Sequence, residues 1–159
     1  MKIALRILLG LLAIAGIIVS SMALRIHFMD PSEAPPCAVT EKWDCGSVNH
    51  SRFAVFPPSP KPTWDNPTPP IGHSVPVAEL GIIGYAAMLL LIAFGRDRLF
   101  LLAAIGGCGF AGYLSYTEAQ VLEKWCIYCV WSQTIVAAMV IFGIVNVALQ
   151  MRRGRNSEA

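Results

Sequence analysis

Four long apolar stretches constrain the fold of this chain more than any other feature. They cover about residues 3–23, 75–95, 99–122 and 126–149. A helix needs about 20 mostly apolar residues to cross a bilayer, and backbone groups in lipid must be paired within the segment. Only 14% of the residues are charged, against about 25% in soluble domains. The sequence therefore predicts an all-α integral membrane protein, with one four-helix bundle as the single domain of residues 1–159.

Positive charges gather on one side of this four-span arrangement. They precede the first span, fill the turn between the second and third, and follow the last: Lys2, Arg6, Arg96, Arg98, Arg152, Arg153 and Arg155. By the positive-inside rule, both termini face the cytoplasm, while a long loop over about residues 25–74 faces outward. An alternative for residues 1–23 is a cleavable signal peptide, which leaves the remaining sidedness unchanged. The net charge of +2 gives no reason to expect a nucleic-acid partner.

The outer loop is rich in proline, which fixes φ and has no amide donor. We therefore expect most of residues 56–72 to be irregular and to form a cap over the helix ends. One short helix is expected at about residues 45–53, where Asp44 is placed to cap its first amides.

Four of the five cysteines lie on the predicted outer side, where disulfides form and persist. Cys126 and Cys129 are one helical turn apart at the start of the last span. There the unpaired amides and the helix dipole favour the thiolate of Cys126. Cys37 and Cys45 lie in the loop. Cys108 lies within the third span among glycines, and is expected to be a small packing residue.

Three interpretations of the outer cysteines remain open. In a redox protein, the loop pair would oxidise an external dithiol protein and pass its electrons to the helix pair and then to a lipid-soluble quinone. Two structural disulfides are the second interpretation, and a zinc site with four thiolates is the third. Zinc sites usually draw on two Cys-X-X-Cys pairs, and the spacing of Cys37 and Cys45 does not supply one. The pattern favours redox chemistry, and no metal site is expected.

Several motifs occur together and in order along the chain. They are Asp44-Cys45-Gly46-Ser47-Val48-Asn49-His50-Ser51, then Pro76-Val77-Ala78-Glu79-Leu80-Gly81 followed by Tyr85, and finally Tyr113-Leu114-Ser115-Tyr116-Thr117-Glu118, which leads through Trp125 into Cys126-Ile127-Tyr128-Cys129-Val130. With these motifs the sequence resembles the vitamin K epoxide reductase family, in particular its bacterial branch. The resemblance covers roughly residues 37–142.

The resemblance implies a four-helix bundle around a quinone, either ubiquinone or menaquinone. It implies a thiol:quinone oxidoreductase of the bacterial inner membrane that reoxidises a soluble thioredoxin-fold partner on the outer side and supports disulfide formation. Cys37 and Cys45 resemble the pair that meets this partner. Cys126 resembles the cysteine that exchanges with Cys45, and Cys129 the one that faces the quinone.

Four further residues are expected near the quinone: Ser51, Glu79, Tyr128 and Gln133. Ser51 matches a serine that the family places near the site. Animal members have an asparagine and a tyrosine that hold vitamin K. The nearest positions here are Ala78 or Glu79 for the asparagine and Gln133 for the tyrosine, and Gln133 retains hydrogen-bonding capacity. These departures favour plain quinone reduction over reduction of the epoxide, which remains an alternative. Ile127 also replaces the family's usual proline.

Two acids near span ends need an explanation, because charge inside a membrane is costly. Glu79 and Glu118 are expected to be interface residues or helix caps, with a catalytic proton role as the alternative.

Overall fold

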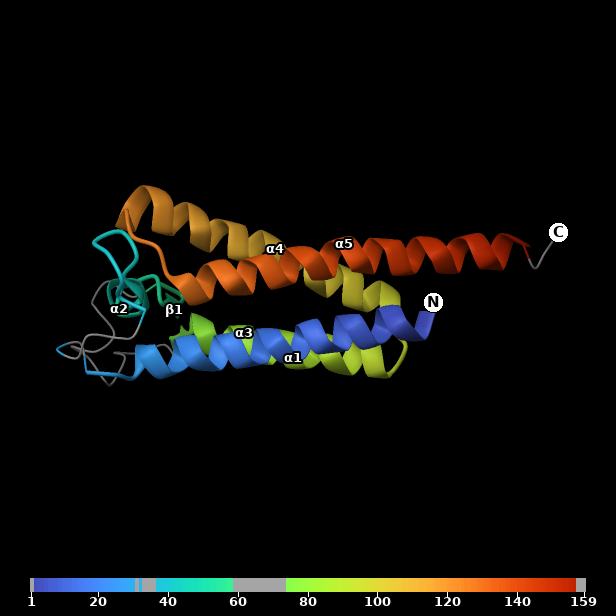
Figure 1. Ribbon diagram of the computed structural model, residues 1–159, viewed down its shortest axis with the longest axis horizontal. Coiled ribbons are helices and arrows are strands. Elements are labelled where there is room, and N and C mark those ends of the chain that lie inside the picture. Colours follow the sequence, from blue (N-terminus) through green and yellow to red (C-terminus); the bar gives the residue numbers. More distant parts are fainter. Residues whose placement is uncertain (1, 31, 33–36, 59–73, 157–159) are drawn as a thin grey trace.

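A computed structural model describes residues 2–30, 32, 37–58 and 74–156 of the protein. Its four long helices are α1 (Lys2–His27), α3 (Val77–Ala93), α4 (Asp97–Thr117) and α5 (Ile127–Asn156), and they run side by side (Figure 1). Three helical segments are long and apolar enough to cross a membrane, namely Ile3–His27, Asp97–Leu122 and Ile127–Arg152. The helix α3 is apolar but shorter. The structure confirms a mostly helical membrane protein.

The helix ends differ from the expected ones by a few residues. The helices α1 and α5 continue past their apolar segments, to His27 and Asn156. Hydropathy marks where lipid contact ends, whereas a hydrogen-bonded helix can extend into water. The helix α4 continues without a break into a π-helical turn, η1 (Glu118–Leu122), as the expected third span required.

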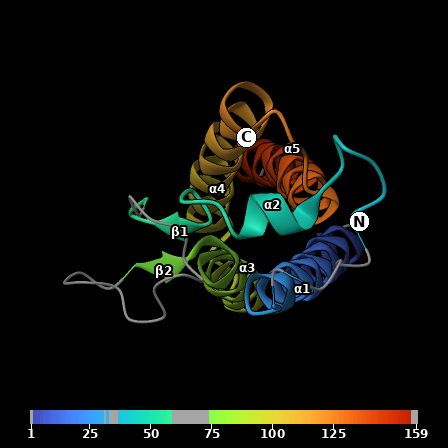
Figure 2. The same cartoon turned by 90° about the vertical axis from the view of Figure 1, so that its left-hand side faces the viewer.

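Both ends of the chain and the turn between α3 and α4 lie at one end of the molecule (Figure 1). The short helix α2 (Cys45–Asn49) lies at the opposite end, across the ends of the long helices (Figure 2). The turn at Arg96 is thus at the same end as both termini, as the positive charges predicted.

A core of apolar side chains joins the long helices. Its buried members include Leu9 and Ala13 of α1, Tyr85 of α3, Phe100 of α4 and Met139 of α5. Helices α1 and α3 approach closely at Gly16, where an added Cβ would overlap the ring of Tyr85. Small residues at such contacts are typical of membrane helices. Cys108 is a free cysteine that packs against this core, as expected.

A buried polar cluster ties three helices together at the end that holds the termini. Asp97 of α4 is only 5% exposed. Its carboxylate accepts hydrogen bonds from Arg6 at 2.6 Å, Asn146 at 2.9 Å and Gln150 at 2.7 Å. These three donors come from α1 and α5. The sequence predicts only a basic turn at this end of the bundle, and it does not predict the Asp97 cluster.

The cap contains more regular structure than expected. Asp44 caps α2 by accepting a hydrogen bond from the amide of Ser47 at 3.0 Å, as predicted, but α2 ends at Asn49 instead of residue 53. The strands β1 (Val55–Phe56) and β2 (Val75–Pro76) form an antiparallel pair that joins the loop to the start of α3. Residues 59–73, the center of the proline-rich stretch, lie outside the described part of the chain.

Candidate redox site

A short backbone pairing aligns the loop with the start of α5. Trp43 and Trp125 form a parallel bridge. The amide of Trp125 donates a hydrogen bond to the carbonyl of Lys42 at 2.7 Å, and the amide of Asp44 donates to the carbonyl of Trp125 at 3.1 Å. Cys45 directly follows Asp44, and Cys126 directly follows Trp125. The main-chain hydrogen bonds therefore set one cysteine beside the other.

Side chains reinforce this alignment at the surface. The ammonium group of Lys124 donates to the carboxylate of Asp44 at 2.9 Å and to the hydroxyl of Ser47 at 3.0 Å. Burial alone would raise the pKa of Asp44, but hydrogen bonds from Ser47 and Lys124 outweigh it and lower the pKa to about 2. Asp44 is therefore ionised at neutral pH and holds both segments.

The structure brings the two cysteines of the loop and the two at the start of α5 together. Cys37 and Cys45 form a disulfide, while Cys126 and Cys129 are free thiols. Cys37, Cys45 and Cys126 belong to one buried cluster, against which Cys129 packs. Cys45 and Cys126 are fully buried. Within the described ranges, no three His, Cys, Asp or Glu side chains are grouped so that they could hold a metal ion.

Asn49 is a site residue that the sequence analysis missed. Its side-chain amide donates to the carbonyl oxygen of Cys45 at 2.9 Å and lies 3.5 Å from the sulfur of Cys126. The main-chain carbonyl oxygen of Asn49 is 2.7 Å from Nδ1 of His27, at the end of α1. One signal was available, because Asn49 is one helical turn after Cys45 and therefore on the same face of α2.

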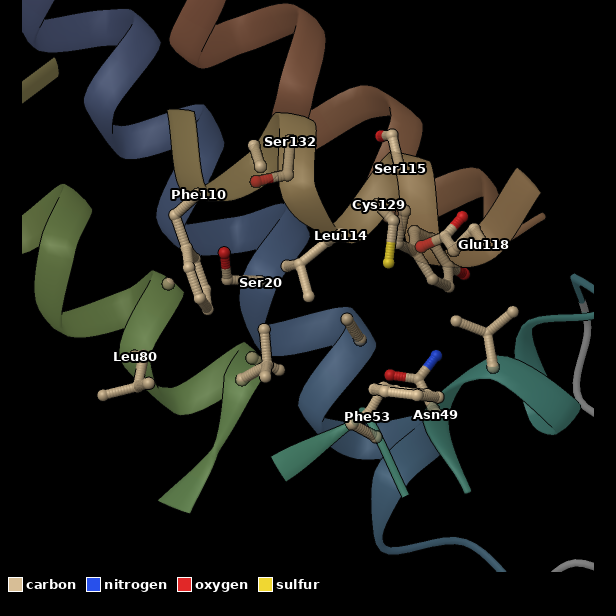
Figure 3. A pocket seen from close by; sticks show the side chains of 18 of the residues that line it. Ser20, Asn49, Phe53, Leu80, Phe110, Leu114, Ser115, Glu118, Cys129 and Ser132 are labelled. Atoms are coloured by element: carbon tan, nitrogen blue, oxygen red, sulfur yellow. The ribbon is translucent and has the colours of Figure 1, made fainter. Parts of the chain in front are cut away.

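A cavity of about 180 Å³ lies between the long helices, and Val48 and Asn49 of α2 form part of its lining. Most of its walls are apolar side chains of α1, α3, α4 and α5, and Cys129 and Glu118 project into it (Figure 3). The hydroxyl of Ser51 also lines it and is buried without a hydrogen-bond partner. An apolar cavity with one unpaired donor and a free thiol fits a flat, apolar molecule that carries carbonyl groups, such as a quinone.

The expected quinone residues are placed in three different ways. Ser51 and Tyr128 line the cavity. Gln133 is half-buried just outside it and accepts a hydrogen bond from Ser115, which is a lining residue. Glu79 is exposed on α3 and lies outside the cavity, whereas its neighbours Ala78 and Leu80 line the wall. The rotation of α3 therefore turns Glu79 away from the site.

Glu118 was expected to be either an interface residue or a helix cap, and the structure shows that it caps the start of α5. Its Oε2 accepts a hydrogen bond from the amide of Cys126 at 3.1 Å. It is not an interface residue, however, because the side chain is only 3% exposed and lines the cavity. The π-helical turn at the end of α4 places this carboxyl group beside the cysteines.

Comparison with known proteins agrees with this geometry. A family model described as the vitamin K epoxide reductase family matches residues 7–144, which include all four cysteines of the site. A comparison with curated proteins gives no match. The matched range covers most of the 159 residues. The chain therefore belongs to the vitamin K epoxide reductase family and is a membrane oxidoreductase of the thiol–disulfide type.

Proposed function

We propose that this protein is a thiol:quinone oxidoreductase that reoxidises a soluble thioredoxin-fold protein and reduces ubiquinone or menaquinone, and so supports disulfide formation. One observation carries the proposal. The Cys37–Cys45 disulfide is buried against Cys126, while Cys129, one turn further on, lines an apolar cavity. The two pairs are thus placed to pass electrons from the cap to the cavity.

The cysteines act in sequence by thiol–disulfide exchange. The dithiol partner attacks the Cys37–Cys45 disulfide, leaves as a disulfide and leaves both loop cysteines reduced. The thiolate of Cys45 then attacks a Cys126–Cys129 disulfide at Cys126, and Cys129 is released as a thiolate. Attack by Cys37 on the Cys45–Cys126 bond restores the loop disulfide and leaves both helix cysteines reduced.

The cavity residues would hold the quinone. When bound, the quinone can accept two electrons and two protons. The hydroxyl of Ser51 is unpaired, so it has a hydrogen bond to give to a carbonyl oxygen. Tyr128 contributes an aromatic surface to the wall. Gln133 supports the site through Ser115. Apolar walls keep water from the reduced thiols.

In the proposed arrangement, the chain is a single domain of four spans, including the shorter α3. The loop over residues 25–74 caps the bundle on the outer side of a bacterial inner membrane. The positive charges of the sequence support a cytoplasmic location for both termini. The partner then meets Cys37 and Cys45 in the periplasm.

Turnover of the purified protein tests the proposal. Full-length protein in detergent, given a reduced thioredoxin-fold protein and a short-chain ubiquinone, should lower the quinone absorbance. Cys126→Ala and Cys129→Ala should each abolish this activity, whereas Cys108→Ala is a matched control that should retain it. Turnover that survives both site substitutions would overturn the proposal.

The alternative reaction is tested by supplying vitamin K epoxide as the only acceptor. Formation of its reduced product at a comparable rate would assign epoxide reduction instead.

A further inference from the structure

Glu118 provides the only carboxyl group among the described residues that line the cavity. It projects from η1 toward the thiol of Cys129, which comes from the first turn of α5 (Figure 3). The same carboxyl group accepts a hydrogen bond from the amide of Cys126 at 3.1 Å, and Cys129 follows one helical turn later, so both side chains face the cavity. An acid and a thiol that share a water-poor cavity exchange protons more readily with each other than with solvent.

No lysine, arginine or histidine lines the cavity within the described ranges, so the charge of Glu118 has no cationic partner there. Lys124 is engaged with Asp44 and Ser47. The titratable groups that share the cavity with Glu118 are Tyr85 of α3, whose hydroxyl bonds Ser132, and Tyr128 and Cys129 of α5; Cys126 is joined to Glu118 through its amide. Of these groups, Cys129 is the thiol that projects into the cavity beside the carboxyl group (Figure 3).

A negative carboxylate and a negative thiolate in the same apolar cavity repel strongly, because the apolar walls screen their charges little. The pair is therefore more stable when it retains one proton between the two groups. A proton held in this way stays inside the cavity, close to the place where a quinone must be protonated.

We propose that Glu118 and Cys129 share a proton, and that Glu118 transfers this proton from the thiol to the quinone during turnover. The step rests on the proposed function. Two electrons and two protons, one proton from each thiol, pass to the quinone as the Cys126–Cys129 bond forms, and a quinol results. Glu118 takes up the proton of Cys129, delivers it to a quinone oxygen and returns to its initial state. The second proton comes from Cys126.

The first test needs no quinone. In a Cys126→Ser, Cys108→Ala background, with the loop disulfide intact, Cys129 is the remaining thiol. Its rate of alkylation by iodoacetamide is measured against pH with Glu118, Glu118→Asp and Glu118→Gln. A shared proton predicts two inflections for the two acids and a single inflection for glutamine. Glutamine keeps an oxygen that can cap the amide of residue 126, so a purely structural role would leave all three profiles alike. Identical profiles overturn the proposal.

The second test is turnover in the chain with all five cysteines. We expect Glu118→Gln to lower kcat about 100-fold with little change in KM, the range typical of a lost proton-transfer group, and Glu118→Asp to recover part of the loss. Glu118→Gln turnover equal to that of the unsubstituted protein overturns the proton transfer. Absence of turnover in the unsubstituted protein refutes the proposed function instead, and the alkylation profiles still decide whether the proton is shared.

Discussion

The amide of Asp44 donates a hydrogen bond to the carbonyl oxygen of Trp125 at 3.1 Å, which joins the residue before Cys45 to the residue before Cys126. The bond belongs to the main chain, so it survives most changes of side chain at either position. The side chains around it decide how firmly the two segments stay together. Asp44 and Asn49 are two of these side chains, and each can be substituted without removing the main-chain bond.

Removing the charge of Asp44 should change how the cap responds to acid. Hydrogen bonds lower its pKa from the ordinary 3.8 to about 2 in the folded protein, although burial opposes them. Because the pKa of Asp44 is lower in the folded than in the unfolded protein, its ionised form stabilises the folded state at pH values above about 4. This stabilisation is lost as the pH falls from about 4 toward 2. Tryptophan fluorescence should therefore report loosening of the Trp43–Trp125 pair over that range.

In Asp44→Asn this acid transition should be absent and the pair should be looser already at neutral pH. Asp30→Asn is the matched control, because among the described residues Asp30 bonds Ser32 and takes no part in the Trp43–Trp125 bridge. A transition of equal size in all three proteins would show that the Asp44 anchor does not hold the cap.

Asn49→Ala should slow exchange between Cys45 and Cys126. The amide of Asn49 is a donor to the sulfur of Cys126, and hydrogen bonds to charged groups contribute about 1.5–3 kcal/mol, so loss of the bond predicts a rate lower by about tenfold or more. In a Cys37→Ala, Cys129→Ala background, the rate of formation of the Cys45–Cys126 disulfide on mild oxidation measures this exchange on non-reducing gels. His50→Ala is the control, since its ring bonds the carbonyl of Met29. Equal rates in both variants contradict the role of Asn49.

Ser51→Ala should raise the stability of the quinone-free protein and reduce the additional stability that quinone binding gives. Leaving a buried hydroxyl unpaired costs about 1–3 kcal/mol, so its removal should raise the thermal midpoint of the quinone-free protein. The rise in midpoint on adding a short-chain ubiquinone should become smaller, because one donor is lost. Ser21→Ala removes a hydroxyl bonded to Ile17 on an exposed face of α1 and should change neither quantity in this way. A larger quinone-induced rise in Ser51→Ala than in the unsubstituted protein would count against the assignment.

Asp97→Ala should destabilise the helices at the end opposite to the cysteines. Asn146 is only 1% exposed and would lose its acceptor, which costs on the order of 2 kcal/mol. The side chain of Arg6 is 39% exposed, so water replaces much of its ion pair. Unfolding in increasing fractions of SDS, followed by circular dichroism, measures the change. Asp97→Asn keeps one acceptor oxygen and should lose less; equal stability of both variants and the parent would exclude a structural role for the cluster.

Local patterns predicted the parts of the fold that depend on one segment at a time. The apolar stretches located the four helices, and Asp44 was recognised as a cap because capping is decided within four residues. Asn49, the Trp43–Trp125 bridge and the Asp97 cluster were missed. Each joins segments that are far apart in the sequence, and such contacts leave no periodic signal in either one. Glu79 shows the same limit, because hydropathy locates α3 but does not fix its rotation.

The Asp97 cluster also determines how the molecule can open. It fastens α1, α4 and α5 at one end, and no described residue of α3 contributes a side chain to it. The cavity lies toward the other end of the bundle, so a change in helix tilt at the Asp97 cluster would have its largest effect on the helix ends near the cavity. A helix of 20 residues is about 30 Å long, and a tilt of about 5° at its pivot moves the far end by roughly 3 Å. A small change of helix angle at the Asp97 cluster would therefore alter the spacing of the helices that line the cavity around Cys129.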